Sequence, residues 1–160
     1  MIYLGVAIGV LLVLGLVLVL WPQLRNWMKH RRDYEAAKAT VHGDKDRYNF
    51  LINKDFRVLE TNFYELNWEM DDGQPNVLGN VLHCETGCDS GLCGTGIACK
   101  TCPVRMILTN SFKQRRDFND VAATMRLYNK DYQVKEVDVR VDGQLVYLGY
   151  EPHFIVGVRT

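Results

Sequence analysis

The sequence predicts an α+β domain over residues 46–160, preceded by a single transmembrane helix. Three observations support this prediction. Residues 2–21 carry no charged side chain. Both ends of residues 46–160 show the alternation of apolar and polar residues that is typical of strands. An amphipathic stretch that begins at Pro103 separates these two groups of strands. Strands that come in groups, with the helices between the groups, favour an antiparallel sheet.

The composition argues against several classes of protein. The chain has 160 residues, with nineteen acidic and nineteen basic side chains, which allows one small domain and an anchor. Nucleic acid is not expected as the main partner, because phosphate binding requires an excess of basic residues on one face. The sequence has no Walker phosphate loop, HExxH motif, GxSxG elbow or dinucleotide fingerprint. We therefore expect no catalytic output domain.

The N-terminal segment, residues 1–22, is the predicted anchor. Ile2–Trp21 is an unbroken apolar run, and a helix of that length spans about 30 Å, the thickness of the hydrocarbon core. A cleaved signal peptide would have positive charges before a shorter run and small residues after it, whereas Trp21-Pro22 follows here. Four basic residues come after the run: Arg25, Lys29, Arg31 and Arg32. The positive-inside rule then places the C-terminal domain in the cytoplasm.

Residues 23–45 are predicted to connect the anchor to the domain. They are charged and contain alanine, which favours a helix from Gln23 to about His42 that stops at Gly43. Several of its residues fall near heptad seam positions, so this helix could pair in a dimer. The alternative is a spacer whose basic residues lie against anionic headgroups.

The domain is expected to open with a β-hairpin. Asn49–Asn53 and Phe56–Asn62 flank Lys54-Asp55 and have the residue types of half-buried strands. The inward-facing candidates are Phe50, Ile52, Phe56 and Val58. Residues 63–80 mix aromatic and acidic residues and contain glycine and proline, which predicts short helices with loops.

One main helix is predicted from Pro103 to near Asp117. Proline suits the first helical position, and an apolar stripe at helical spacing follows it: Val104, Ile107, Leu108 and Phe112. Cys102 would then be the N-cap residue. The helix dipole, with Lys100 and Arg105 nearby, favours a thiolate at this end of the helix.

The C-terminal third is predicted to consist of three antiparallel strands. Val121–Tyr128 is the first. Valines alternate with charged residues over 137–141, Asp142-Gly143 has the composition of a two-residue hairpin turn, and Leu145–Leu148 returns. His153–Arg159 is apolar enough to lie centrally in the sheet.

All five cysteines lie within one glycine-rich segment: Cys84, Cys88, Cys93, Cys99 and Cys102. Four of them could ligate zinc or an iron–sulfur cluster, with the dipole and Arg105 favouring thiolates at Cys93, Cys99 and Cys102. They could also form a redox pair, or be small buried side chains without chemistry. In a reducing compartment, metal or redox chemistry is commoner than a static disulfide framework.

The histidines are weaker candidates. His83 could join the cysteines as a metal ligand, but a buried or capping role is favoured. We expect His153 to lie on the surface, and His30 and His42 to belong to the basic connecting segment.

Three parts of 46–159 together resemble a PAS domain, a small sensory module of bacterial signalling proteins. NFLINKDFRVLETN is similar to the family's first hairpin, Asn80–His83 with CGTGIACKTCPVR is similar to a cysteine-rich subset, and VDGQLVYLGYEPHFIVGVRT is similar to its last strands. The resemblance implies a five-stranded antiparallel sheet with helices on one face, a pocket for a ligand or cofactor, and dimerisation through the N-terminal helix. It names no ligand.

Three functional hypotheses follow. The first is a sensory module anchored in the bacterial inner membrane. It responds to redox state, oxygen or a metal through cysteines 84–102 and signals to a partner such as a sensor kinase or another membrane protein. The second is an interaction module of a membrane complex, stabilised by structural zinc. The third is a thiol oxidoreductase that uses Cys99 and Cys102, disfavoured because that motif belongs on a βαβ framework.

Overall fold

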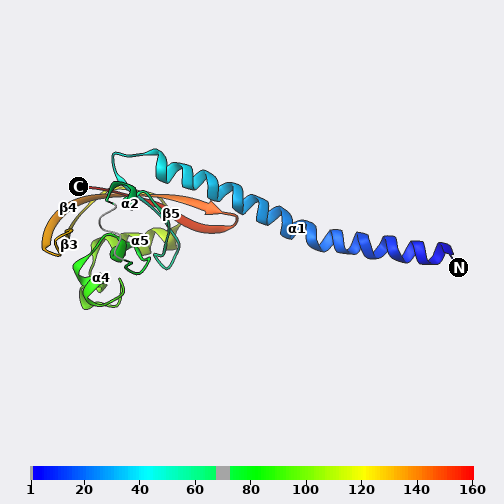
Figure 1. The fold of residues 1–160 in the computed structure, drawn as a ribbon, viewed down its shortest axis with the longest axis horizontal. Coiled ribbons are helices and arrows are strands. Elements are labelled where there is room, and N and C mark those ends of the chain that lie inside the picture. Colours follow the sequence, from blue (N-terminus) through cyan, green and yellow to red (C-terminus); the bar gives the residue numbers. More distant parts are fainter. Residues whose placement is uncertain (1, 68–72) are drawn as a thin grey trace.

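In the computed structural model, the backbone is described for residues 2–67 and 73–160, and side chains from Gly15 onward. A long helix leads into a five-stranded sheet, with short helices between the second and third strands (Figure 1). The elements are α1 (Ile2–Gly43), β1 (Tyr48–Ile52), β2 (Val58–Thr61), α2 (Phe63–Leu66), α3 (Leu78–Val81), α4 (Glu85–Asp89), the 3-10 helix η2 (Ile97–Lys100), α5 (Pro103–Gln114), β3 (Phe118–Tyr128), β4 (Val134–Leu148) and β5 (Glu151–Arg159).

The sheet is antiparallel throughout, in the order β2-β1-β5-β4-β3. The predicted five-stranded antiparallel sheet is therefore confirmed. The last strand of the chain, β5, lies at its centre, and its residues 153–158 are all buried. This central position agrees with the apolar character from which it was predicted.

Helices cover both faces of the sheet. Helices α2 to α5 lie on one face, over a core that includes Phe50, Leu108 and Phe154. The C-terminal turns of α1 lie on the other face, where they contribute Ala37 and Val41 to a second cluster (Figure 1). The helices within the domain thus lie on one face, as predicted, whereas the position of α1 on the other face was not predicted. Strand β1 alternates apolar residues to both sides, so both sides need cover.

The first hairpin has the predicted interior. Its four inward-facing candidates, Phe50, Ile52, Phe56 and Val58, are all buried in the main core. Phe56 lies outside both strands, in a turn with φ of 60°, where its backbone N–H donates to the carbonyl of Asn53 at 2.9 Å. The core position of Phe56 was predictable, and its turn conformation was not.

The predicted turn at Asp142-Gly143 is wrong, because β4 runs unbroken through it. Gly143 pairs with Phe118 of β3 on one side and with Val156 of β5 on the other. A Cβ atom on Gly143 would lie 2.0 Å from Cε1 of Phe118, so this glycine admits an aromatic ring rather than a turn. The turn comes later, at Gly149, which has φ of 66°.

Helix α1 is continuous from Ile2 to Gly43, with Pro22 inside it. The predicted helical connection and its end at Gly43 are therefore confirmed. Among the helices with described side chains, none combines the length and apolar character needed to cross a bilayer. Residues 2–14 of the predicted anchor lie outside the described side chains.

Candidate cysteine-lined site

The cysteine-rich segment, residues 84–102, is attached to the edge strand β3. Cys84 forms a β-bridge with Leu127, and the backbone N–H of Tyr128 donates to the carbonyl of His83 at 2.8 Å. Two side-chain contacts add to these: Arg126 pairs with Glu85 at 3.0 Å, and the Tyr128 hydroxyl donates to Asp89 at 2.8 Å. The start of the segment therefore lies against the sheet.

Asn80 of α3 holds the middle of the segment in place. Its side chain is fully buried, accepts a hydrogen bond from the backbone N–H of Cys93 at 2.7 Å, and donates to the carbonyl of Gly87 at 3.2 Å. One amide thus satisfies a donor and an acceptor from two different turns. This role of Asn80 was not predicted, and its only signal in the sequence is a polar residue inside an apolar helix.

Four of the five cysteines line one cavity of about 280 Å³: Cys84, Cys93, Cys99 and Cys102. The cavity lies between the cysteine-rich segment, the start of α5 and strand β3, and its other walls include Phe56, Leu108 and Met125. Cys88 is half-buried and is not part of its lining. No disulfide joins any of the five in the described part of the chain.

Two glycines allow groups of the site to approach the backbone closely. A Cβ atom on Gly79 would lie 2.5 Å from Sγ of Cys93, and one on Gly94 would lie 2.6 Å from Nη1 of Arg105. Gly94 also has φ of 105°, which other residues rarely adopt. These glycines therefore leave the space that one thiol and the guanidinium group occupy at the cavity.

Burial raises the pKa of two cavity thiols. For Cys84, burial is the main cause, the neighbouring Cys102 and Cys99 add to it, and backbone hydrogen bonds at Gly87 and Thr86 oppose it. For Cys93, burial and Cys99 outweigh the opposing effects of the Gly79 backbone and Arg105. At Cys93, desolvation therefore opposes the thiolate that Arg105 favours.

Arg105 belongs to the first turn of α5 and also lines the cavity. Its guanidinium lies over the Phe56 ring, 4.8 Å from the centroid, a geometry that favours the cation. It therefore supplies a positive charge beside Cys93. Cys102 is the N-cap residue of α5, as predicted, with Pro103 at the helix start.

In the described residues, no three histidine, cysteine or acidic side chains lie close enough together to hold a metal ion. His83 is buried with its ring stacked on Phe63, at 6.3 Å between centroids, and is not part of the cavity lining. His153 is buried, with 5% of its surface exposed, so the prediction of a surface position is wrong. It belongs to the central strand β5, where both faces are covered.

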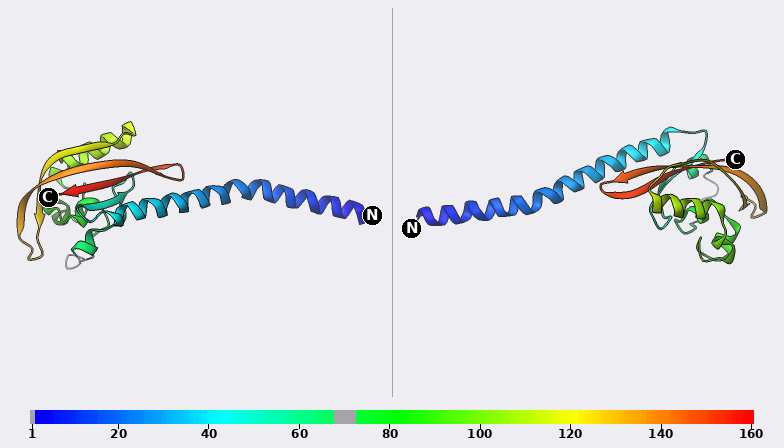
Figure 2. Two further views of the ribbon diagram at one scale, coloured as in Figure 1. Left: turned by 90° about the horizontal axis from the view of Figure 1, so that it is seen from above. Right: turned by 180° about the vertical axis from the view of Figure 1, so that it is seen from behind.

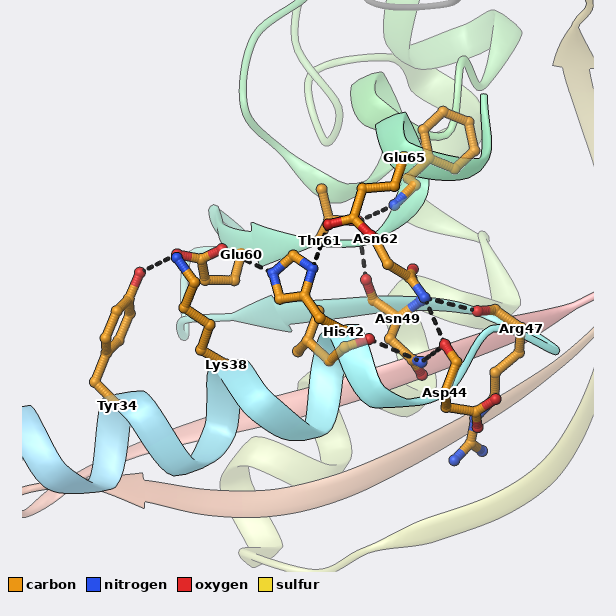
Figure 3. Close-up of polar contacts among 12 residues, drawn as sticks. Tyr34, Lys38, His42, Asp44, Arg47, Asn49, Glu60, Thr61, Asn62 and Glu65 are labelled. Carbon is orange, nitrogen blue, oxygen red and sulfur yellow. Dashed lines mark hydrogen bonds and ion pairs between the residues drawn. The ribbon is translucent and has the colours of Figure 1, made fainter. Parts of the chain in front are cut away.

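A polar cluster joins α1 to the sheet on the opposite face (Figure 3). Three side chains of α1 contact the carboxylate of Glu60 in β2: the Tyr34 hydroxyl, Lys38 Nζ at 3.1 Å and His42 Nε2 at 3.2 Å. His42 Nδ1 also lies 2.6 Å from Glu65. This cluster, Tyr34, Lys38, His42, Glu60 and Glu65, is termed the helix clamp.

The helix clamp shifts two pKa values in opposite directions. Burial alone would raise the pKa of Glu60, but hydrogen bonds from Tyr34, His42 and Lys38 outweigh it and hold the pKa below its ordinary 4.5. Burial and the bond to Glu60 raise the pKa of Tyr34 to about 12. Glu60 is thus a charged acceptor bound to the helix at neutral pH.

Comparisons with known proteins give similarities at the level of solved structures. No family model matches the chain, and no curated protein matches it. The chain is similar to the PAS domain of a protein from Desulfitobacterium hafniense, with 14% identity over 71% of this chain and 92% of that chain and a TM-score of 0.43. It is also similar to the PAS domain of an HTR-like protein from Haloarcula marismortui, with 12% identity over 81% of this chain and 97% of that chain and a TM-score of 0.36.

Proposed function

We propose that this chain is a sensory module, anchored in the bacterial inner membrane, that receives its signal at the cysteine-lined cavity. The signal is a change in redox state, oxygen or metal, and the response passes to a partner protein in the membrane or cytoplasm. One observation carries the proposal: four unbridged thiols, from segments up to eighteen residues apart in sequence, line a single cavity.

The donor set fits a thiophilic metal centre. Thiolates are the preferred ligands of zinc and of iron–sulfur clusters, and both take four. Such a group would be held by the four cysteines that line the cavity: Cys84, Cys93, Cys99 and Cys102. Arg105 would offset its negative charge, and Cys88, which is not in the lining, would not be a ligand. The group would supply sensitivity to oxygen or to metal supply. Because the thiols are not within ligating distance as they stand, the segment would have to close around it.

Metal content tests this proposal directly. Full-length protein, purified anaerobically in detergent, is analysed for zinc, iron and sulfide and by visible absorbance. We expect a stoichiometric metal or cluster that is lost in Cys99→Ser and Cys102→Ser and retained in the matched control Cys88→Ser. Equal loss in the Cys88→Ser protein, or no metal in the wild type, would contradict the assignment.

A redox pair is the second candidate, because Cys93 and Cys99 line the same cavity and Cys99 Sγ accepts a hydrogen bond of 3.3 Å from the N–H of Gly94, the residue after Cys93. With hydrogen peroxide as oxidant, the two thiols would give one disulfide and two molecules of water. The raised pKa of Cys93 disfavours its thiolate, which is the form that attacks the peroxide. A protein without metal that forms one Cys93–Cys99 disulfide, seen by mass spectrometry after peroxide treatment, would support this candidate over a metal centre.

The anchor is supported by the exposed surface of α1. Residues 15–28 are all exposed, and Leu16, Leu18 and Trp21 each expose more than half of their surface. Apolar side chains exposed around a whole helix are typical of contact with lipid. We expect the chain to stay with membranes in carbonate and in high salt, and release of intact protein by salt alone would contradict the anchor.

A further inference from the structure

The two hairpin ends of the C-terminal strands point in opposite directions. The turn between β4 and β5 extends along α1 toward the N-terminal side, whereas the turn between β3 and β4 lies at the far end of the sheet (Figures 1 and 2). Each turn carries one tyrosine with 69% of its surface exposed, Tyr150 in the first and Tyr132 in the second.

The β4–β5 turn is fixed to α1 by contacts on one side of the helix. The N–H of Gly149 donates to Asp33 at 3.3 Å, and Lys29 Nζ lies 4.4 Å from the centre of the Tyr150 ring. A Cβ atom on Gly149 would lie 3.3 Å from Asn26 Oδ1, so the turn lies directly against the helix. These contacts therefore define the position of the turn along the axis of α1.

The position of the turn along α1 can be compared with that of Trp21, where the proposed anchor leaves the membrane. Asn26 and Asp33 follow Trp21 by five and twelve residues, which is about 8 and 18 Å along a helix that rises 1.5 Å per residue. A headgroup layer extends about 5–8 Å beyond the hydrocarbon core, and the potential of anionic lipids reaches about 8–10 Å further. A Cβ atom on Gly149 would also lie 3.6 Å from the Cβ of His30, which is about 13 Å beyond Trp21 along the helix. The turn thus lies just outside the headgroups and within the range of their potential.

The charges around the turn match an anionic surface. Residues 25–33 contain four basic side chains and one acidic one, Asp33, which accepts a hydrogen bond from Gly149 and lies 3.9 Å from Arg32. Arg25, Lys29 and Arg32 fall within about 60° of one another around the helix. Glu151, beside Tyr150, is exposed, and its negative charge partly offsets the positive charge of these basic residues. Tyrosine rings with neighbouring basic groups are typical of the membrane interface.

We propose that the β4–β5 turn, with Tyr150 and the face of Arg25, Lys29 and Arg32, docks onto the anionic headgroups of the membrane. The sheet would then have a fixed orientation, with the cysteine-lined cavity on the face turned away from α1. This inference rests on the anchor in the proposed function and adds a second, peripheral contact to it.

A photo-crosslinking amino acid tests the docking. p-Benzoylphenylalanine replaces Tyr150 or, as the control of equal exposure, Tyr132, in full-length protein reconstituted into vesicles of three parts phosphatidylcholine to one part phosphatidylglycerol. We expect lipid adducts at position 150 and not at 132. Arg25→Gln and Arg32→Gln should each lower the adduct yield at 150 up to about fivefold, as loss of about 1 kcal/mol per basic residue implies. Vesicles of phosphatidylcholine alone should lower it as well.

The outcomes separate this inference from the anchor. Retention of the protein in carbonate without an adduct at 150 would overturn the docking and leave the anchor intact. Adducts of equal yield at both positions, or an adduct at 150 to protein instead of lipid, would also overturn it. Release in carbonate with no adduct would overturn both, whereas release with a lipid adduct at 150 would support the docking and overturn the anchor alone.

Discussion

Asn80 offers the sharpest test of how the cysteine-rich segment is held. Replacing it with alanine removes the acceptor for the N–H of Cys93, which is half-buried, and the donor for the carbonyl of Gly87, which is buried. An unsatisfied buried polar group costs about 1–3 kcal/mol. One buried and one half-buried group, partly relieved by water, give an expected loss of about 2–4 kcal/mol. This is a large fraction of the about 5–15 kcal/mol that stabilises a domain.

The measurement has two parts. Chemical denaturation of the full-length protein in detergent should show the loss of stability, and titration with an aromatic disulfide reagent should show faster reaction of Cys93, because its backbone is released. Asn110→Ala is the matched control, since Asn110 is exposed on α5. If Asn80→Ala changes stability by less than about 0.5 kcal/mol and leaves thiol reactivity unchanged, Asn80 does not hold the segment.

Three further predictions concern the sheet and α1. Ile155→Asp should unfold the domain, because a charge would enter the core beneath α1 at a cost of several kcal/mol, and a cooperatively melting variant would show that β5 is not central. Gly143→Ala should cost about 1–3 kcal/mol by displacing the Phe118 ring, whereas Gly43→Ala, with nothing near its Cβ position, should be nearly neutral in the same melting experiment. Glu60→Gln should destabilise at neutral pH. Since the pKa of Glu60 is lowered on folding, its contribution is present above 4.5 and is lost as the pH falls through the lowered value, so the two stability curves should converge in acid.

Local patterns in the sequence predicted most of the fold. The stripe after Pro103, the inward residues of the first hairpin and the apolar β5 were all interpreted correctly, because each is a periodicity that burial imposes. The turn predicted at Asp142-Gly143 was an incorrect interpretation. An Asp-Gly pair has the same composition whether it bends the chain or admits a ring from the neighbouring strand, and only the position of Phe118 decides between the two.

The candidate site was predictable in composition and less so in arrangement. The grouping of the cysteines and the N-cap position of Cys102 could be inferred from spacing alone. The four cysteines that line the cavity could not be identified from the sequence, because their positions depend on how Asn80 folds the segment back on itself. The raised pKa of Cys93 could not be predicted either, since it depends on the balance between desolvation and the charge of Arg105.

The long strand β4 has a consequence for local opening of the sheet. It pairs with β3 mainly over Val134–Val141 and with β5 over Arg140–Leu148, so it has a neighbour on both sides only around 140–143. The β3–β4 and β4–β5 hairpins are therefore staggered along β4 and overlap only at these residues. Their outer ends are two-stranded ribbons, which twist more and protect their amides less than a wider sheet. Amide hydrogens along this single strand should exchange in two separate groups, each opening with its own hairpin, with the slowest amides where the two hairpins overlap.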